Sequence, residues 1–294
     1  MPKILHSYSN LNFKGTDKTV SFRSQALSAI CAKKVYGEVE FWGNQKVIDY
    51  LEETGIASLY DNIEVIPDDF VAYYDVFASA GKFYSLLRQD KPAIHIDGDT
   101  FLFAPLQNDP CDIFFAHDDI DLDSLNTIAN IQSAYDCYVY PWKDFVSEED
   151  DIFRFDLAYI YNMSVIGVVN LEKANKVFTE VLEGYKKYKD RFKKDTPHWH
   201  ISEQFFTGYY CKKLNINATS LYKMVSQWVD SEDNFYFENK LHSGNNFVCK
   251  NGFIPPDVFP MTHASSHWLN TPQLQSWVNL NLKEFGYESI IKKT

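Results

Sequence analysis

Two aspartates flank a glycine at Asp97-Gly98-Asp99, directly after the short apolar run AIHI (Ala93–Ile96). The run is typical of a buried strand, so both carboxylates are expected at a strand end. Mg²⁺ and Mn²⁺ prefer carboxylate oxygens and keep coordination positions open for a diphosphate. A D-x-D sequence also occurs in plain solvated turns, and the preceding strand is what favours a divalent-metal site here.

A strand followed by D-x-D also opens the phosphatases of the haloacid-dehalogenase type. In that class Asp97 would be the nucleophile of a Mg²⁺-dependent phosphohydrolase. The class carries Thr or Val two residues after the second Asp, whereas Thr100 is the very next residue here. Its motif also begins the fold, whereas three strand–helix units come first in this chain. The phosphohydrolase is therefore the second hypothesis.

The elements that must position these carboxylates alternate along the chain. Strands are predicted at Lys3–Tyr8, Val39–Trp42, Ile63–Ile66, Ala93–Ile96, Asp112–Ala116 and Ser164–Val169, and helices at Ser24–Tyr36, Gln45–Thr54, Val76–Leu87 and after an N-cap at Asn170. This order predicts an α/β fold, with a mainly parallel sheet and helices on both faces. The carboxyl ends of parallel strands share one rim, so His6–Tyr8 and Asp97–Asp99 are expected to meet there.

The last eighty residues show only weak periodicity and are rich in Asn, Ser, Pro and aromatic residues. No internal repeat and no clear linker divides the chain. We therefore expect a single domain over residues 1–294.

Composition and charge exclude several classes of protein. The chain carries 28 Lys and Arg against 40 Asp and Glu, a formal net charge of −12, which argues against nucleic-acid binding. Its 45% hydrophobic content is enough for a core and rules out global disorder. No run approaches the ~20 apolar residues of a membrane helix, the start resembles no secretory signal, and the 5 cysteines contain no CxxC pair. A cytoplasmic protein without a transmembrane segment is expected.

Several segments resemble those of nucleotide-sugar glycosyltransferases of the GT-A fold, in particular the glycogenin-like and capsular-polysaccharide-type enzymes. The matching segments, in chain order, are KILHSY, AGKFYSLLRQ, IHIDGDTFLF, YNMSVIGVVN, SEQFF and THASSHW. They extend over roughly residues 3 to 268, and the match is most specific around Asp97 and Asp99. Where relatives carry a Gly and a Lys in the last segment, this sequence has Ser266 and His267.

The resemblance implies a three-layer α/β/α sandwich of GT-A type, with a Rossmann-like nucleotide-binding half at 1–110 and an acceptor and sugar half at 111–294. It also implies three sets of site residues. The ligands of Mn²⁺ or Mg²⁺ would be Asp97, Asp99 and His263. The residues in contact with the nucleotide-sugar donor would be His6, Ser7, Tyr8, Lys82, Gly98, Asn162, Gly167 and His267. The catalytic residues, facing the transferred sugar, would be Glu203 and Gln204.

Most of these residues also have a purely structural interpretation. His6 could be an ordinary polar residue at a strand end, and Tyr8 a packing residue. Lys82 stands outside the apolar stripe of its helix and could lie on a solvated helix face. Asn162 could end a strand or cap a turn, and Glu203 could simply favour a helix N-terminus.

Three further motifs are given structural interpretations. His198-Trp199-His200 could join Glu203 as a metal cluster, but no second set of ligands is visible, so a loop is expected. HDDIDLD (His117–Asp123) could bind a cation or the acceptor, although charge runs are usually solvated. His263 and His267 could both pack against Trp268.

The metal-binding motif and the resemblance together imply a metal-dependent glycosyltransferase that moves a sugar from a nucleotide-diphosphate donor, a UDP-sugar, to a hydroxyl acceptor. The acceptor could be a glycan, a lipid-linked sugar or a protein. The metal would offset the charge of the departing diphosphate, and Glu203 would act as a base or stabilise an oxocarbenium-like sugar. A nucleotide-sugar-binding protein without turnover is the third hypothesis. The sugar, the acceptor and the stereochemical course stay open.

Overall fold

Strands and helices alternate from the N-terminus of the computed structural model, which describes residues 1–9, 18–74, 77, 79–120, 160–189, 203–204, 206–225, 236–239, 246–248, 261–263 and 272–294. The strands are β1 (Lys3–Tyr8), β2 (Val39–Gly43), β3 (Asn62–Val65), β4 (Ala93–Ile96), β5 (Thr100–Leu102), β6 (Ile113–Ile120), β7 (Ile160–Tyr161), β8 (Val165–Val168), β9 (Ala218–Val225), β10 (Tyr236–Asn239), β11 (Asn246–Val248) and β12 (Met261–His263). The helices are α1 (Lys18–Tyr36), α2 (Gln45–Thr54), the 3₁₀ helix η1 (Ile56–Leu59), α3 (Asp68–Tyr73), α4 (Ala80–Leu86), α6 (Leu171–Tyr188), α7 (Phe206–Lys213), α9 (Pro272–Glu284) and α10 (Glu288–Lys293).

Local sequence signals set several helix ends. Asn170 accepts a hydrogen bond from the Lys173 N–H at 3.2 Å and caps α6, which confirms the predicted N-cap. Gly37 and Gly55 end α1 and α2 with φ of 86° and 81°, a left-handed conformation that glycine adopts without steric cost. The predicted helix stops at these two glycines are therefore confirmed.

One large sheet runs through the molecule. Among the described residues, seven of its strands follow the order β9-β6-β8-β4-β1-β2-β3, and of these β8 alone runs opposite to the rest. β10 and β11 extend the sheet beyond β9 with antiparallel pairings. The predicted mainly parallel sheet is thus confirmed. The direction of β8 departs from the parallel pattern, because β8 pairs antiparallel with both β4 and β6.

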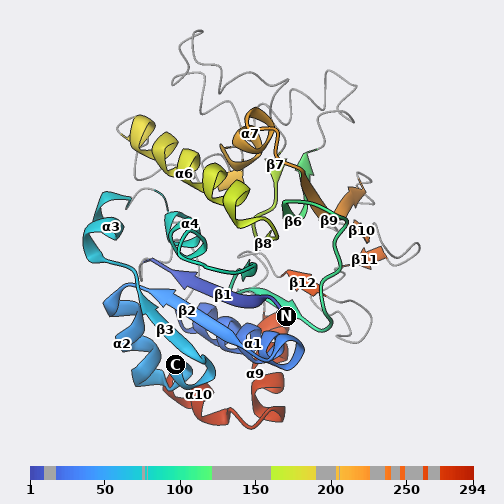
Figure 1. Cartoon of the computed structure of the whole chain (residues 1–294). Coiled ribbons are helices and arrows are strands. Elements are labelled where there is room, and N and C mark those ends of the chain that lie inside the picture. The colour runs from blue at the N-terminus through green and yellow to red at the C-terminus, as the bar shows by residue number, and fades with distance from the viewer. Residues whose placement is uncertain are drawn as a thin grey trace.

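Helices cover both faces of this sheet and form two separate cores (Figure 1). The core beneath α1, α2, α9 and α10 includes Ile4, Phe22, Phe41, Leu51, Trp277 and Leu282. The core beneath α4, α6 and α7 includes Leu5, Phe83, Phe115, Phe178, Tyr185 and Phe206. Adjacent residues of β1, such as Ile4 and Leu5, point to opposite cores because side chains alternate along a strand. The three-layer α/β/α sandwich expected from the sequence is therefore present.

Two predicted helices have different bounds. α1 begins at Lys18 rather than at Ser24, so it contains an additional turn at its N-terminal end. The helix predicted over residues 76–87 is shorter in the structure, where α4 begins at Ala80. Before α4 the chain makes two tight turns, in which the Phe77 N–H donates to Tyr74 O at 2.8 Å and the Ala80 N–H donates to Phe77 O at 3.0 Å. The Phe77 ring stacks on Tyr185 of α6 at 4.1 Å, so this residue of the predicted stripe is buried although it precedes α4.

The C-terminal residues are more regular than the sequence suggests. α9 and α10 form over part of the segment described above as weakly periodic. Leu274, Trp277, Val278 and Leu282 are all buried and lie at helical spacing, a stripe that the sequence contained and the prediction overlooked. The acidic stretch HDDIDLD is also partly regular, because its first four residues continue β6.

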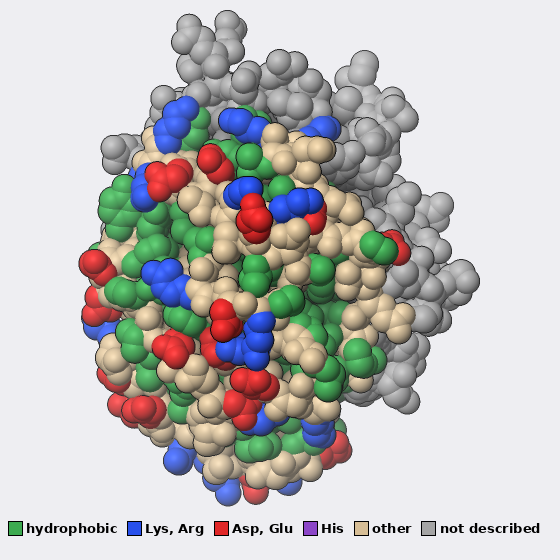
Figure 2. Space-filling model, in the orientation of Figure 1, with side chains coloured by type: hydrophobic (Ala, Val, Ile, Leu, Met, Phe, Trp, Pro, Cys, Tyr) green, Lys and Arg blue, Asp and Glu red, His purple; other side chains and the backbone are tan. Residues whose placement is uncertain are grey.

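The described residues on the face of the molecule shown in Figure 2 carry no large patch of charges of one sign. Lys and Arg side chains lie interspersed with Asp and Glu over this face. Among the described residues, every helix is too short or too polar to cross a lipid bilayer.

Candidate active site

The Asp97-Gly98-Asp99 motif forms the connection between β4 and β5, which we call the DGDT turn (residues 97–100). The Asp97 N–H donates to Ser164 O at 2.9 Å, and the Thr100 N–H donates to Asp97 O at 2.9 Å. The three motif residues are partly exposed, whereas Thr100 is fully buried. Both carboxylates therefore stand at the carboxyl end of a central strand.

Strand β12 brings a residue from far along the chain to this turn. It pairs antiparallel with β5, and His263 lies opposite Thr100 in the register. Directly opposed residues in such pairs have Cα atoms about 4.5–5.5 Å apart, so the His263 backbone lies beside the DGDT turn. Its side chain falls outside the described part of the chain. The fold thus brings the third predicted metal ligand next to Asp97 and Asp99.

Lys82 of α4 lies at the centre of the site. Its ammonium group is 2.8 Å from Asp97 Oδ1 and 3.0 Å from Asp97 Oδ2, and it pairs with Glu203 Oε1. It also donates to Met163 O at 3.3 Å. The Lys82 and Glu203 side chains are only 14% and 13% exposed. A solvated helix face is therefore excluded for Lys82, and α4 connects the DGDT turn to the segment that enters α7.

Burial and the charges of the site together shift the pKa values of the groups around the turn. Burial, followed by the charge of Asp97, raises the pKa of Asp99 to about 8, and Lys82 opposes this rise. Burial alone would lower the pKa of Lys82, but Asp97 and Glu203 outweigh it, so the pKa of Lys82 is raised and the ammonium stays charged. Burial and then the charges of Asp99 and Asp97 raise the pKa of the Tyr8 phenol. Crowded carboxylates of this kind favour the binding of a cation.

The donor set of the DGDT turn fits a divalent cation only in part within the described residues. No group of three His, Cys, Asp or Glu side chains able to hold a metal occurs among them. The turn contributes two carboxylates, and the imidazole of His263 would be the third ligand. Oxygen ligands with one imidazole suit Mn²⁺ and Mg²⁺, and a cation would relieve the repulsion that raises the pKa of Asp99.

His6 occupies a different place from the one predicted. It is 1% exposed, its Nδ1 lies 2.9 Å from Tyr60 Oη, and its Nε2 lies 3.2 Å from Ser28 Oγ. Burial lowers the pKa of His6 to about 3, so the ring is neutral. Both ring nitrogens lie within hydrogen-bonding distance of buried side chains. His6 is therefore a structural residue beneath the DGDT turn and does not face a ligand.

Ser7 and Tyr8 remain at the open end of β1. Both are partly exposed, and Ser7 Oγ lies 2.8 Å from Nε2 of the buried His95. The Tyr8 ring packs beside Phe22 at 5.7 Å between centroids. These two residues therefore stand on the same rim as the DGDT turn, as the parallel order of β1 and β4 predicts.

Three further residues expected to contact the donor have structural roles: Asn162 caps a turn, and Gly98 and Gly167 allow close packing. Asn162 Oδ1 accepts from the Ser164 N–H at 3.0 Å, so Asn162 caps a turn, which was its structural interpretation. A Cβ on Gly98 would lie 3.0 Å from Gln25 Cβ, so Gly98 lets α1 approach the turn closely. Gly167 lies inside β8, where the ring of Phe114 fills the space a side chain would need. Gly167 is thus a packing residue that pairs with Ile94, two residues before the end of β4 at which the DGDT turn begins.

Gln204 lies next to Glu203 and is 7% exposed. Its Oε1 has no hydrogen-bond partner among the described residues. A buried carbonyl oxygen without a partner is suited to receive a ligand hydroxyl or a water. His267 and the histidines of the 198–200 segment lie outside the described residues.

Sequence reasoning missed two kinds of group at this site. The Met163 carbonyl is a backbone atom and carries no residue-type signal. Ser24 and Ser28 of α1 contact the carbonyls of the DGDT turn, and their spacing of four, which places both on one face of the helix, was the available signal.

Comparison with known proteins supplies a family and a structural likeness. A family model described as "Family of unknown function (DUF6734)" matches residues 8–248. No curated protein matches the sequence. A crystal structure of the galactosyltransferase LgtC with donor and acceptor sugar analogues is 14% identical, at a TM-score of 0.40, over 74% of this chain and 72% of that one. The glycosyltransferase GlyE of Streptococcus pneumoniae TIGR4 is 10% identical, at a TM-score of 0.37, over 75% of this chain and 45% of that one.

Proposed function

This chain belongs to the DUF6734 family, and we propose that it is a metal-dependent glycosyltransferase that uses a nucleotide-sugar donor. The observation that carries the proposal is the position of Lys82, which joins Asp97 of the DGDT turn to Glu203. The two carboxylates of the turn, the Lys82 ammonium group and the Glu203 carboxylate therefore lie together, with the turn at the carboxyl end of β4. A metal-bound nucleoside diphosphate linked to a sugar would use all of these groups.

The acidic residues of the turn would hold the metal. Asp97 and Asp99, with His263 from β12, would bind Mn²⁺ or Mg²⁺, which when bound offsets the charge that builds on the departing diphosphate. Asp97 already faces a cation, because Lys82 contacts both of its oxygens.

Lys82 and Glu203 would act on the donor itself. Lys82 is a buried point charge that can neutralise a diphosphate oxygen, and its ion pair holds Glu203 in a fixed orientation. Glu203 would then stabilise the positive charge of an oxocarbenium-like sugar or accept the proton of the acceptor hydroxyl. Gln204 Oε1 would accept from a sugar hydroxyl, and Ser7 and Tyr8 would contact the nucleoside at the end of β1.

A thermal-shift panel tests the proposal directly. We expect UDP and UDP-sugars to raise the melting temperature when Mn²⁺ is present and to have little effect without it. A ligand at 100 times its Kd stabilises by about 2.7 kcal/mol, so even modest binding is visible. Release of UDP from a set of UDP-sugars measures turnover in the same samples.

Asp99→Asn is the informative variant and Asp109→Asn its matched control, since Asp109 is an exposed aspartate outside the site. We expect Asp99→Asn to abolish the Mn²⁺-dependent shift and Asp109→Asn to retain it. Equal UDP–Mn²⁺ binding by Asp99→Asn and wild type would refute the metal assignment. Release of phosphate from a simple phosphoester would favour the phosphohydrolase, and binding without UDP release would favour a non-catalytic protein.

A further inference from the structure

A row of buried polar side chains connects η1 to the DGDT turn. Gln25 Nε2 lies 3.1 Å from Tyr60 Oη, and Tyr60 Oη lies 2.9 Å from His6 Nδ1. His6 Nε2 lies 3.2 Å from Ser28 Oγ, which is hydrogen-bonded to the carbonyl oxygen of Thr100. These side chains are between 0% and 7% exposed, so water does not compete with them.

The chemistry of the two ends fixes the direction of every bond in the row. A backbone carbonyl only accepts, so Ser28 donates to Thr100 O and must itself accept from His6 Nε2–H. Burial lowers the pKa of His6 to about 3, so the imidazole is neutral and its bare Nδ1 accepts the Tyr60 phenol proton. Tyr60 Oη then accepts from the NH₂ group of the Gln25 side chain, which only donates. One arrangement of protons therefore satisfies every bond between Gln25 Nε2 and Thr100 O, while Gln25 Oε1 has no hydrogen-bond partner among the described residues.

A second serine of α1 holds the same turn. Ser24 Oγ donates to Gly98 O at 3.0 Å, and Ser28 Oγ also lies 3.5 Å from Asp97 O. Ser24 and Ser28 are four residues apart and lie on one face of the helix. The carbonyls of the DGDT turn thus face hydroxyls of α1, on the side where Gln25 contacts Gly98.

We propose that α1 positions the metal-binding turn, with Ser24 and Ser28 as positioning residues and the Gln25–Tyr60–His6 row as the device that fixes the Ser28 hydroxyl. The buried hydrogen bonds from Gln25 Nε2 to Thr100 O restrict the Ser28 hydroxyl to one orientation, so the turn that carries Asp97 and Asp99 is ordered before a cation arrives. The effect on metal binding rests on the function proposed above. The arrangement of protons and the rigidity of the turn do not rest on it.

Nuclear magnetic resonance of the metal-free full-length chain tests the proton arrangement. Long-range ¹H–¹⁵N spectra distinguish the two neutral tautomers of a histidine from the charged ring. Comparison with Tyr60→Phe assigns the His6 signals, because that change removes the partner of Nδ1. We expect a proton on Nε2 and a bare Nδ1 between pH 6 and 8. A proton on Nδ1 would overturn the proposed direction of the row.

Amide exchange tests the positioning role without any ligand. The Thr100 N–H is bonded within the turn, and its exchange should accelerate ~10-fold in Ser28→Ala, since about one hydrogen bond is lost. Ser24→Ala provides a second variant that acts on Gly98 O. The matched control is Ser21→Ala, because Ser21 is a buried serine of the same helix, 6% exposed, and within the described part of the chain the α1 serines that hydrogen-bond to the turn are Ser24 and Ser28. Equal exchange in all three variants would refute the positioning role.

Metal titration then separates positioning from general destabilisation. With UDP present, we expect Ser28→Ala to need ~10-fold more Mn²⁺ for half-saturation than Ser21→Ala, at similar melting temperatures. Equal Mn²⁺ requirements would contradict the positioning of the metal ligands. Failure of the wild type to bind UDP–Mn²⁺ would refute the proposed function instead, and the exchange and tautomer results would still decide the inference about α1.

Discussion

At the scale of single residues, the position of Lys82 determines what the site can do. Three oxygen atoms of Asp97 and Glu203 surround its ammonium group, and the Met163 carbonyl completes the set. A lysine in this place compensates carboxylates that have little access to water. It therefore has a structural role as well as the proposed role toward a diphosphate.

Replacing Lys82 with Met separates these two roles when it is compared with Glu203→Gln. Lys82→Met leaves two partly buried carboxylates without their cation, so the free energy of unfolding should fall by about 3 kcal/mol. Glu203→Gln keeps an acceptor for Lys82, so stability should fall by less than ~1 kcal/mol. Both variants should lose at least ~100-fold in sugar transfer.

Urea denaturation and UDP release measure the two effects independently. Unchanged stability of Lys82→Met would contradict the bridging role of the ammonium group. Full transfer activity of Glu203→Gln would remove Glu203 from the catalytic residues, and full transfer activity of Lys82→Met would leave Lys82 with a structural role alone.

At the scale of elements, close packing determines which residues the central strands accept. β8 lies between β4 and β6, with Gly167 opposite Ile94 on one side and Phe114 on the other. A Cβ built on Gly167 would lie 1.9 Å from Phe114 Cζ. The absence of a side chain at this position is therefore needed by the sheet itself.

A double-mutant cycle tests this packing explanation for Gly167. Gly167→Ala alone should lower the free energy of unfolding by ~3 kcal/mol, because the Phe114 ring must move out of a well-packed position. The same change should cost much less in a Phe114→Ala background, where the ring is gone. Equal costs in both backgrounds would indicate that Gly167 is required for another reason.

Strand β2 carries a buried ion pair that makes stability depend on pH. Glu40 is 2% exposed, and it accepts from Lys3 Nζ at 2.8 Å, from Asn62 Nδ2 at 3.2 Å and from the Trp42 indole N–H. Burial by itself raises the pKa of Glu40, but the bonds from Lys3, Trp42 and Asn62 outweigh burial, so the pKa is lowered. The charged form is therefore the one that the fold stabilises.

Glu40→Gln should lower the free energy of unfolding by about 2 kcal/mol at neutral pH, since hydrogen bonds to a charged group are lost. A carboxyl whose pKa is lower in the folded state stabilises the protein fully above its unfolded pKa of ~4.3. That contribution is lost as the pH falls through the folded value. The difference between wild type and Glu40→Gln should thus be constant from pH 6 to 8 and shrink below about pH 4.

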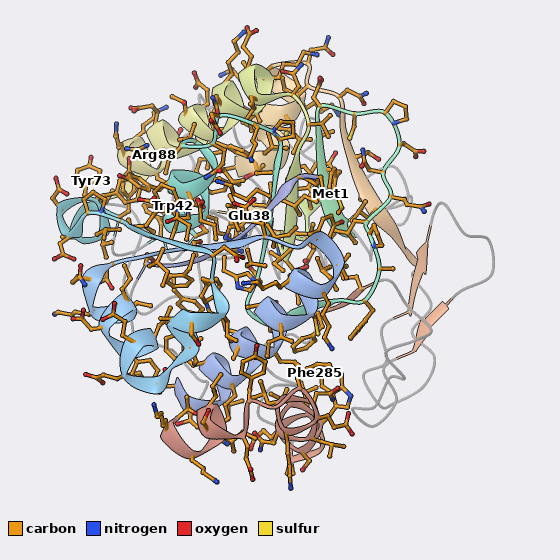
Figure 3. The ribbon with its side chains drawn as sticks, turned by 60° about the horizontal axis from the view of Figure 1, so that its bottom comes forward. Met1, Glu38, Trp42, Tyr73, Arg88 and Phe285 are labelled. Atoms are coloured by element: carbon orange, nitrogen blue, oxygen red, sulfur yellow. The ribbon has the colours of Figure 1, made fainter. Side chains whose placement is uncertain are left out.

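Urea denaturation across this pH range measures the effect. Glu38→Gln is the matched control, because Glu38 is an exposed carboxylate beside the start of β1 (Figure 3). The control should change stability by less than ~0.5 kcal/mol at every pH. A constant difference for Glu40→Gln down to pH 3 would contradict the lowered pKa.

At the scale of the whole molecule, the C-terminal helices return to the first half of the chain. Trp277 of α9 packs edge-on against Phe101 of β5 at 5.1 Å, directly after the DGDT turn. Phe285, at the end of α9 (Figure 3), lies under the ammonium group of Lys34 of α1 at 3.3 Å. Arg23 of α1 donates to the Ile291 carbonyl of α10 at 2.7 Å. One core therefore combines residues from both ends of the sequence.

Leu282→Ala should weaken the whole fold rather than the C-terminus alone. Leu282 is 0% exposed in the core shared with α1, so its truncation should cost ~3 kcal/mol. Leu280→Ala on the same helix is the control, because Leu280 is 53% exposed and should cost less than ~0.5 kcal/mol. Hydrogen exchange in β1 and β4 should accelerate together with exchange in α9. Acceleration confined to α9 and α10 would show that the halves unfold separately.

The sequence by itself determined the local features of this protein. Alternating apolar runs and helical stripes predicted β1, β2, β4 and α6, and Gly37, Gly55 and Asn170 marked helix ends. These features depend on residues a few positions apart, so their signals are complete within a short segment. The meeting of β1 and β4 at one rim also followed, because parallel strands must share their carboxyl ends.

The tertiary structure alone decided which groups meet. Glu203 is 121 residues from Lys82 in the sequence, and β12 reaches β5 from the far end of the chain. It also turned His6 into a buried support of the DGDT turn and made Gly167 a packing residue. Residue type states what a side chain can bind, but the partner depends on packing between distant segments, which no local pattern contains.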